Sequence, residues 1–309
     1  MSGVVTGFGV ITSVVVIGYM LGRLSLLGPG ARDVLSALAF YVAGPALMFT
    51  ILLDTDLSVL WSGKVVVSAL SVAVVVAVVV IIGLVRRWGV SRTTMSALTS
   101  SYVNAGNLGL PIASYVLGDA SLVAPILLTQ MLVMAPIAVT VLDLAGGEVR
   151  GAGPVLRRAL GTPIRNPLLL ASLAGVTVSA AGWAPPTPFL EPFELIGGMA
   201  VPAMLLAFGI SLHGSGMPGR GPHRGSVLLA VALKSVAQPL VAWALGALLF
   251  DLAGPDLFAV VVLAALPTAQ NVFTYALRFR VEVDTVRDAV LISTFATVPV
   301  LFAATFLLG

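Results

Sequence analysis

The feature that most constrains this sequence is a set of long runs without charge. Residues 65–84 form one such run, in which every residue is apolar, glycine or serine. Charged residues make up only 9% of the 309-residue chain and apolar residues 59%, whereas a soluble domain carries about 25% charged residues. The run is apolar on all sides, as helices surrounded by lipid are. We therefore expect an all-α integral membrane protein that has the lipid bilayer as its solvent.

Ten runs approach or reach the length of roughly 20 residues that a membrane helix requires. Their expected bounds are 3–22, 34–53, 63–85, 94–117, 121–142, 165–182, 190–212, 225–250, 256–279 and 285–308. No connection between them is long enough to hold a soluble domain. The sequence thus predicts ten transmembrane helices.

The arginines predict which side of the membrane each connection faces. All 14 fall in alternate connections, whereas the other connections hold acids and the single cation Lys64. These arginines are Arg23, Arg32, Arg86, Arg87, Arg92, Arg150, Arg157, Arg158, Arg165, Arg220, Arg224, Arg278, Arg280 and Arg287. The positive-inside rule places the arginine-rich connections in the cytoplasm. We expect a multi-pass protein of the inner (plasma) membrane with both termini extracytoplasmic.

The composition also argues against several other classes of protein. The chain has no cysteine, and its two histidines, His213 and His223, fall in one loop, so no metal site and no cofactor are expected. A nucleic-acid-binding protein needs a basic face with exposed aromatic residues, and the arginines here are confined to short clusters. Because no histidine, cysteine or acid lies deep within a predicted helix, we do not expect an enzyme.

The connection at 143–164 divides the ten runs into two sets of five. Because five is odd, a duplicated second half enters the membrane from the opposite side, which gives an inverted-topology repeat. We expect residues 1–142 to form the first five-helix repeat and residues 165–309 the second. The stretch between them is expected to be a short cytoplasmic linker.

The fourth run of each half is interrupted near its middle. The first interruption reads Asn104-Ala-Gly-Asn-Leu-Gly-Leu-Pro111, and the second reads Leu266-Pro-Thr-Ala-Gln-Asn271. Glycine and proline there are expected to unwind both helices, which hydrocarbon tolerates only where the segment is buried in protein or lines a wet cavity. Pro111 and Pro267 are expected to be the first residues of new half-helices. The positive ends of these half-helices would then point to the middle of the membrane.

Two such helix ends, flanked by side-chain amides, form a site for a small anion. The residues expected to bind it are Asn104, Gly106, Asn107, Pro111, Gln130, Lys234, Pro267, Gln270 and Asn271. Gln130 either donates to a carboxylate or makes an interhelical hydrogen bond. If Lys234 is functional, its partner is either the substrate carboxylate or backbone carbonyls freed at a break. The structural alternative is that Lys234 snorkels or rests on helix carbonyls.

These motifs resemble those of the auxin efflux carrier family, to which the plant PIN proteins belong. The stretch 104–111 is similar to the fourth-helix signature of that family, 265–271 and 291–294 to its ninth and tenth helices, and Lys234 with 238–240 to its eighth. The resemblance covers nearly the whole chain. It implies the fold shared with bile-acid sodium symporters, in which helices 4 and 9 cross. It further implies a scaffold of helices 1, 2, 6 and 7, a transport core of helices 3–5 and 8–10, a homodimer, and elevator-type alternating access.

The function that the sequence predicts is secondary transport of a small organic anion, either a simple carboxylate or an auxin-like acid. Two alternatives stay open. One is a sodium-coupled solute symporter of the bile-acid symporter type, in which carbonyls and amides at the same breaks hold Na⁺. The other is a membrane sensor that transports nothing.

Overall fold

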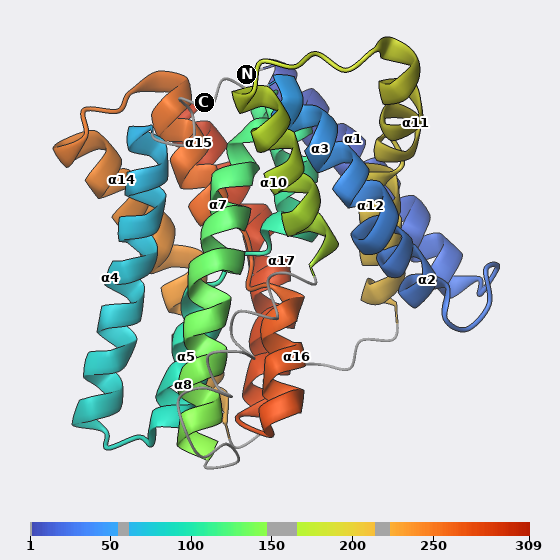
Figure 1. Ribbon diagram of the computed structural model, residues 1–309. Coiled ribbons are helices and arrows are strands. Elements are labelled where there is room, and N and C mark those ends of the chain that lie inside the picture. Colours follow the sequence, from blue (N-terminus) through green and yellow to red (C-terminus); the bar gives the residue numbers. More distant parts are fainter. Residues whose placement is uncertain (1, 55–61, 147–165, 214–222) are drawn as a thin grey trace. The chain divides into compact units, whose positions relative to one another are not determined.

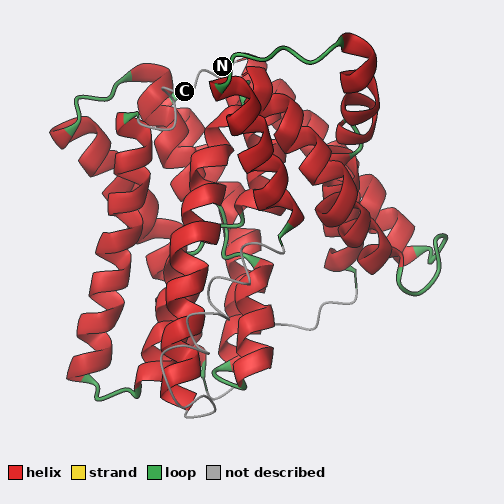
Figure 2. Ribbon diagram, viewed as in Figure 1, coloured by secondary structure: helices red, strands yellow, loops and turns green. Residues whose placement is uncertain are grey.

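The computed structural model describes residues 2–54, 62–146, 166–213 and 223–309. These residues form helices joined by turns and loops, and none of them is in a strand (Figure 2). Helix α8 continues to Gly146, so the expected linker at 143–164 begins inside a helix. The rest of that linker lies outside the described residues, as do five of the arginines used to predict orientation: Arg150, Arg157, Arg158, Arg165 and Arg220.

Within these residues, six helical stretches are long and apolar enough to cross a membrane. They are Ala31–Leu53, Gly63–Val85, Ala120–Gly146, Thr187–Leu212, Arg224–Leu249 and Val283–Leu308. Four shorter apolar helices are Gly9–Arg23, Ala105–Leu117, Pro167–Ala180 and Gly254–Ala264. The chain is therefore consistent with a multi-pass membrane protein. The count of ten transmembrane helices and the inverted repeat stay predictions.

The chain folds into two compact units, each assembled from three separate segments. Unit 1 comprises Met1–Ser62, Ala105–Leu128 and Ile164–Gly216, and unit 2 comprises Gly63–Asn104, Thr129–Pro163 and Met217–Gly309. The expected helices 1, 2, 6 and 7 fall in unit 1 and the expected helices 3, 8, 9 and 10 in unit 2. The expected helices 4 and 5 are divided between the units. The assignment of a scaffold and a transport core stays a prediction.

Unit 1 is built from pairs of closely packed helices. Its elements are α1 Ser2–Arg23, α2 Ala31–Leu38, η1 Ala39–Ala43, α3 Gly44–Asp54, η3 Ala105–Gly109, α6 Leu110–Ile112, η4 Ala113–Leu117, η5 Ala120–Val123, α7 Ala124–Thr129, α10 Pro167–Ala180, α11 Thr187–Gly197 and α12 Ala200–Leu212. Helix α1 packs against α12, and α3 packs against α10, beside which it runs in Figure 1.

Glycines allow the backbones of α1 and α12 to touch. A Cβ atom added at Gly18 would lie 2.5 Å from the carbonyl oxygen of Leu206, and one added at Gly209 would lie 2.2 Å from that of Val15. Both distances are far below van der Waals contact. Small residues at membrane helix interfaces permit this close approach, which strengthens packing where lipid offers no hydrophobic driving force.

Substitution of Gly18 by alanine tests this contact. We expect Gly18→Ala to destabilise unit 1 by about 1–3 kcal/mol, the usual cost of overpacking a tight interface. The measurement is the thermal unfolding midpoint of the purified protein in detergent. Gly9→Ala in the same helix is the control, because no atom lies within 4 Å of its added Cβ; equal midpoints for the two variants would contradict the packing described here.

Unit 2 contains the segment that leads into the first interrupted region and the segments that lead into and out of the second. Its elements are α4 Gly63–Val85, α5 Val90–Ser101, η6 Gln130–Met134, α8 Ala135–Gly146, α13 Arg224–Ala232, η7 Leu233–Ala237, α14 Gln238–Leu249, α15 Gly254–Ala264, α16 Gln270–Phe279 and α17 Val283–Leu308. Helices α4, α5 and α8 lie side by side (Figure 1), α14 packs on α4 and α15, and α16 packs on α17.

Ion pairs connect first-half and second-half elements within unit 2. Lys64 Nζ, in the first turn of α4, lies 2.9 Å from Asp256 Oδ1 in α15. Arg92 Nε, in α5, lies 3.3 Å from Glu282 Oε1 at the start of α17. The guanidinium of Arg92 also donates to the Ser226 hydroxyl of α13, over 3.2 Å. These contacts fix the ends of helices whose middles form the candidate site.

Four π-helical turns precede prolines at a constant spacing. The turns η1, η3, η6 and η7 each end two residues before a proline, and these prolines are Pro45, Pro111, Pro136 and Pro239. A proline inside a helix removes a backbone donor, and its ring clashes with the carbonyl four residues earlier. A wider π turn just before the proline relieves that clash, and such turns are frequent at functional sites.

Candidate functional site

The two interrupted segments pair with each other inside unit 2. Helix α5 ends at Ser101 and α15 ends at Ala264, and the extended residues beyond them form an antiparallel bridge between Val103 and Thr268. The N–H of Asn104 donates to the Pro267 carbonyl over 2.8 Å, and the N–H of Ala269 donates to the Tyr102 carbonyl over 3.0 Å. The bridge is therefore a crossing held by main-chain hydrogen bonds; we call residues 102–104 and 267–269 the crossing.

The structure corrects the expected position of both prolines. Pro267 does not begin a half-helix: it lies in the crossing, and α16 begins three residues later at Gln270. The carbonyl of Pro267 is needed as an acceptor for Asn104, which holds this residue extended. In unit 1, Pro111 lies in the short helix α6, but the chain is already helical from Ala105 because η3 precedes it.

Side chains donate to backbone carbonyls that the first interruption releases. The Thr268 hydroxyl donates to the Thr99 carbonyl over 2.7 Å. The amide Nε2 of Gln238, in α14, donates to the Ser101 carbonyl over 3.3 Å, and Nε2 of Gln130, in η6, donates to the Val103 carbonyl over 2.9 Å. Because a buried carbonyl without a donor is costly, these three side chains stabilise the interruption.

The second interruption is stabilised in the same way. Lys234 Nζ, fully buried in η7, donates to the carbonyl of Ala264, the last residue of α15, over 2.8 Å. The Thr297 hydroxyl, in α17, lies 3.3 Å from the Ala265 carbonyl. Lys234 therefore rests on a freed backbone carbonyl, which is one of the partners expected for it.

The backbone N–H of Thr268 completes the pairing of the crossing with α17. It donates to the hydroxyl oxygen of Ser293 over 3.1 Å, and that hydroxyl donates in turn to the Val290 carbonyl of its own helix. Thr294, one residue further on, donates only within its helix, to the same carbonyl.

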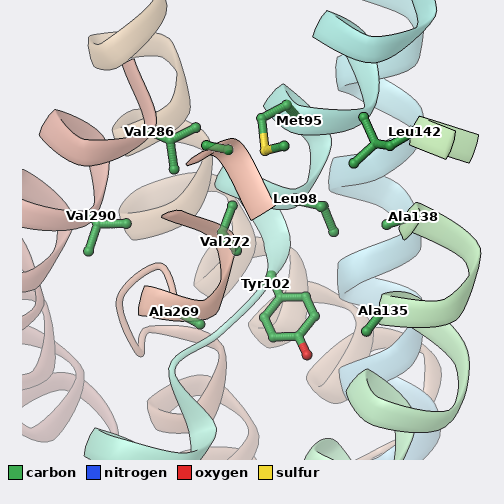
Figure 3. Close-up of a cluster of buried hydrophobic side chains, with 11 residues drawn as sticks. Met95, Leu98, Tyr102, Ala135, Ala138, Leu142, Ala269, Val272, Val286 and Val290 are labelled. Carbon is green, nitrogen blue, oxygen red and sulfur yellow. The ribbon is translucent and has the colours of Figure 1, made fainter. Parts of the chain in front are cut away.

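An apolar cluster packs against one side of the crossing. Tyr102 and Ala269, from the two paired segments, both belong to it, and Figure 3 shows them with Leu98 of α5 and Ala135 and Ala138 of α8. The cluster continues along α16 and α17 through the buried side chains of Val272, Ala276, Val286 and Val290. This packing excludes water from one side of the crossing, which strengthens the electrostatic interactions there.

Helix α16 starts at the crossing with a positive end that its own N-cap residue does not cap. Its N-cap residue, Ala269, makes no side-chain cap hydrogen bond. The first two residues of the helix, Gln270 and Asn271, carry amide side chains, and that of Asn271 is exposed. The first N–H groups of a helix have no intrahelical acceptor and favour negative charge.

The predicted site residues are divided between the two units. Unit 2 brings together Asn104, Gln130, Lys234, Pro267, Gln270 and Asn271 on or next to the crossing. Gly106 and Asn107 lie in η3 and Pro111 in α6, all in unit 1. That the nine residues bind a substrate stays a prediction.

Sequence reasoning left out several residues that hold the crossing in place. Thr268, Gln238 and Thr297 all donate to freed carbonyls, and none is in the predicted set. For Gln238 the available signal was its place directly before Pro239, next to the π turn that holds Lys234. Thr297 also lies just before a proline, Pro299, but α17 is an ordinary α-helix there, so the pattern does not single it out.

Two acidic residues are buried, although acids were expected in loops or at helix ends, where side chains are usually exposed. Asp143 is 2% exposed in the last turn of α8, and Asp288 is 8% exposed near the start of α17, where Arg287 Nη2 lies 3.0 Å from it. Both lie on helices of unit 2 away from the hydrogen bonds of the crossing.

Comparison with known proteins identifies the family. A family model described as "Membrane transport protein" matches residues 8–148 and 154–304. The chain belongs to this family. It is the auxin efflux carrier family that the motifs indicated. Membership points to a membrane transporter rather than an enzyme.

Two relatives align with most of the chain. The "Putative malonate transporter" of Rhizobium meliloti is 28% identical over 293 residues, which cover 91% of this chain and 88% of the relative. The "Uncharacterized transporter" of Methanothermobacter thermautotrophicus is 26% identical over 298 residues, which cover 91% of this chain and 90% of the relative. Both alignments extend well beyond either unit, so the similarity concerns the whole fold.

Proline at position 269 tests the main-chain pairing. Ala269 has φ −69°, which proline adopts without strain, so Ala269→Pro removes the N–H bonded to Tyr102 and leaves that carbonyl without its donor. We expect a loss of about 1–3 kcal/mol, measured as a lower thermal unfolding midpoint. Ala269→Gly keeps the N–H and adds no side chain that could cap α16, so it is the control; if both variants unfold at the midpoint of the parent protein, the pairing does not contribute to stability.

Proposed function

We propose that this chain is a secondary transporter of small carboxylates, which it binds as anions at the crossing. The observation that carries the proposal is an electrical asymmetry at the second interruption. Breaking a helix creates a negative end, where the first part stops, and a positive end, where the second part starts. Here the negative end of α15 has a lysine on its last carbonyl, and the positive end of α16 has no side-chain cap.

The lysine makes this asymmetry large. Lys234 is fully buried and uses one of its three N–H donors on the Ala264 carbonyl. No other Lys or Arg is buried among the residues that the structure describes. A charge in a low-dielectric interior acts over long distances, so in its protonated form Lys234 offsets the dipole of α15 and raises the potential around the crossing. An anion at the start of α16 is then stabilised both by the dipole of that helix and by the charge of Lys234. None of the crossing residues carries a carboxylate that would repel it.

Carboxylates are the substrate class that fits these groups. Backbone N–H groups at a helix start and the amides of Gln270 and Asn271 are donors, and a carboxylate is an acceptor with two oxygens. The name of the Rhizobium meliloti relative specifies malonate, a small dicarboxylate. We therefore propose malonate and similar short acids first, and larger auxin-like acids as the second group to test.

The proposal extends to the mode of transport. We propose elevator-type alternating access in which unit 2, which holds the crossing and the side chains that donate to its carbonyls, carries the anion across the membrane. We further propose a homodimer in the inner (plasma) membrane with both termini extracytoplasmic. Support comes from the family, from the distribution of arginines and from the concentration of crossing contacts in one unit.

Replacement of the buried lysine tests the proposed function. Lys234→Met keeps the side-chain volume but removes the charge and the donor to Ala264, so we expect malonate uptake into proteoliposomes to fall about tenfold or more. Lys64→Met is the matched control, because Lys64 is the other lysine of the chain and forms a partly exposed ion pair. Such pairs contribute little, so uptake by this variant should match that of the parent.

Two results would refute the proposal. One is the absence of uptake or binding by the parent protein for malonate, other mono- and dicarboxylates and indole-3-acetate. The other is unchanged malonate uptake by a folded and inserted Lys234→Met variant.

A further inference from the structure

The carbonyl oxygens released at the first interruption are occupied in a regular pattern. The carbonyls of Thr99, Ser101 and Val103 alternate along the chain, and each accepts a hydrogen bond from a side chain of a different segment. The donors, which we call the carbonyl caps, are Thr268 of the crossing, Gln238 of α14 and Gln130 of η6. Their exposed fractions are 1%, 1% and 3%, so water does not compete for these bonds.

Without these donors, the freed carbonyls would be available to coordinate a cation. Unwound backbone carbonyls and the carboxyl ends of half-helices are the groups that coordinate Na⁺ in transporters with broken helices. A carbonyl oxygen that coordinates an ion must direct a lone pair at it, and a buried side-chain donor competes for the two lone pairs of that oxygen. At this crossing, two further carbonyls, those of Pro267 and Tyr102, are engaged by backbone N–H groups.

The second interruption follows the same rule. The carbonyl of Ala264 accepts from Lys234, and the carbonyl of Ala265 shares the Thr297 hydroxyl with the nearer carbonyl of Ser293 (3.3 Å against 2.9 Å). Two oxygen atoms remain buried without a hydrogen-bond partner among the described residues near the crossing, Ser235 Oγ and Gln238 Oε1. Both are within four residues of Lys234 along the chain, so a protonated Lys234 disfavours a cation beside them.

We infer that the carbonyl caps Gln130, Gln238 and Thr268 determine the charge preference of the site, because they occupy the oxygens that would otherwise bind Na⁺. The groups that remain available to a ligand at the crossing are then hydrogen-bond donors: the first N–H groups of α16 and its side-chain amides. The exclusion of Na⁺ rests on these hydrogen bonds and on Lys234, whereas the resulting preference for a carboxylate rests on the proposed function. In this role Gln130 acts indirectly: it holds the Val103 carbonyl by its hydrogen bond and does not itself contact the substrate.

Removing a cap should create a response to Na⁺. Thr268→Val and Gln130→Leu keep the approximate shape of the side chain and each free one carbonyl. The measurement is the thermal unfolding midpoint in NaCl and in choline chloride at equal concentration. We expect the parent protein to show equal midpoints in the two salts, and each variant to unfold about 3 °C or more higher in NaCl, as expected for an ion that binds only the folded state.

A threonine elsewhere in the same unit provides the control. Thr305 is buried in α17 and its hydroxyl donates only to Leu301 of its own helix. Thr305→Val therefore loses a similar hydroxyl without freeing a carbonyl of the crossing, and its midpoints should not depend on Na⁺. If either cap variant shows no unfolding transition, Gln238→Leu replaces it, since it removes the longest of the three bonds.

The inference is overturned if Na⁺ specifically stabilises the parent protein, if folded cap variants gain no response to Na⁺, or if Thr305→Val gains the same response. A failure of the proposed function is recognised separately. In that case the parent takes up no carboxylate, while the midpoints in NaCl and choline chloride still decide whether the caps exclude the cation.

Discussion

The structure depends on one constraint: backbone polar groups released inside a membrane protein must find partners within the protein. Each interrupted helix loses several N–H···O bonds, and the crossing recovers two of them by pairing the segments through Asn104 with Pro267 and Ala269 with Tyr102. Side chains of α14, α17 and two π turns supply further donors. The two interruptions therefore compensate for each other's lost backbone hydrogen bonds. Neither segment alone has this set of partners.

The π turns explain how polar side chains reach the crossing from helices that are otherwise apolar. Gln130 opens η6 and Lys234 lies in η7, and each turn precedes a proline by the same spacing. A π turn placed just before a proline eases the clash between its ring and the preceding turn, and at both positions a polar residue of that turn donates to a freed carbonyl. One sequence device therefore both bends the helix and positions a donor. The same spacing at η3 and Pro111 places Gly106 and Asn107 of unit 1 in such a turn.

Much of this arrangement could be predicted from local sequence, and part of it could not. Glycine, proline and asparagine identified both interruptions because their backbone effects are local. The partner of each freed carbonyl was not predictable in this way, since Thr268 and Thr99 are 169 residues apart and meet only through the tertiary fold. The role expected for Pro267 was wrong for the same reason: its local preference for a helix start yields to a hydrogen bond from the distant Asn104. The count of ten transmembrane helices and the inverted repeat stay predictions.

The most direct test of the central claim is a disulfide across the crossing. Val103 and Thr268 form the kind of antiparallel pair whose Cα atoms lie about 4.5 Å apart, within disulfide range, and the chain has no native cysteine. We predict that Val103→Cys/Thr268→Cys forms an intramolecular disulfide with diamide, seen as loss of maleimide labelling after denaturation. Val103→Cys/Thr305→Cys should stay fully labelled. Full labelling of the first pair after oxidation would contradict the meeting of the two interrupted helices.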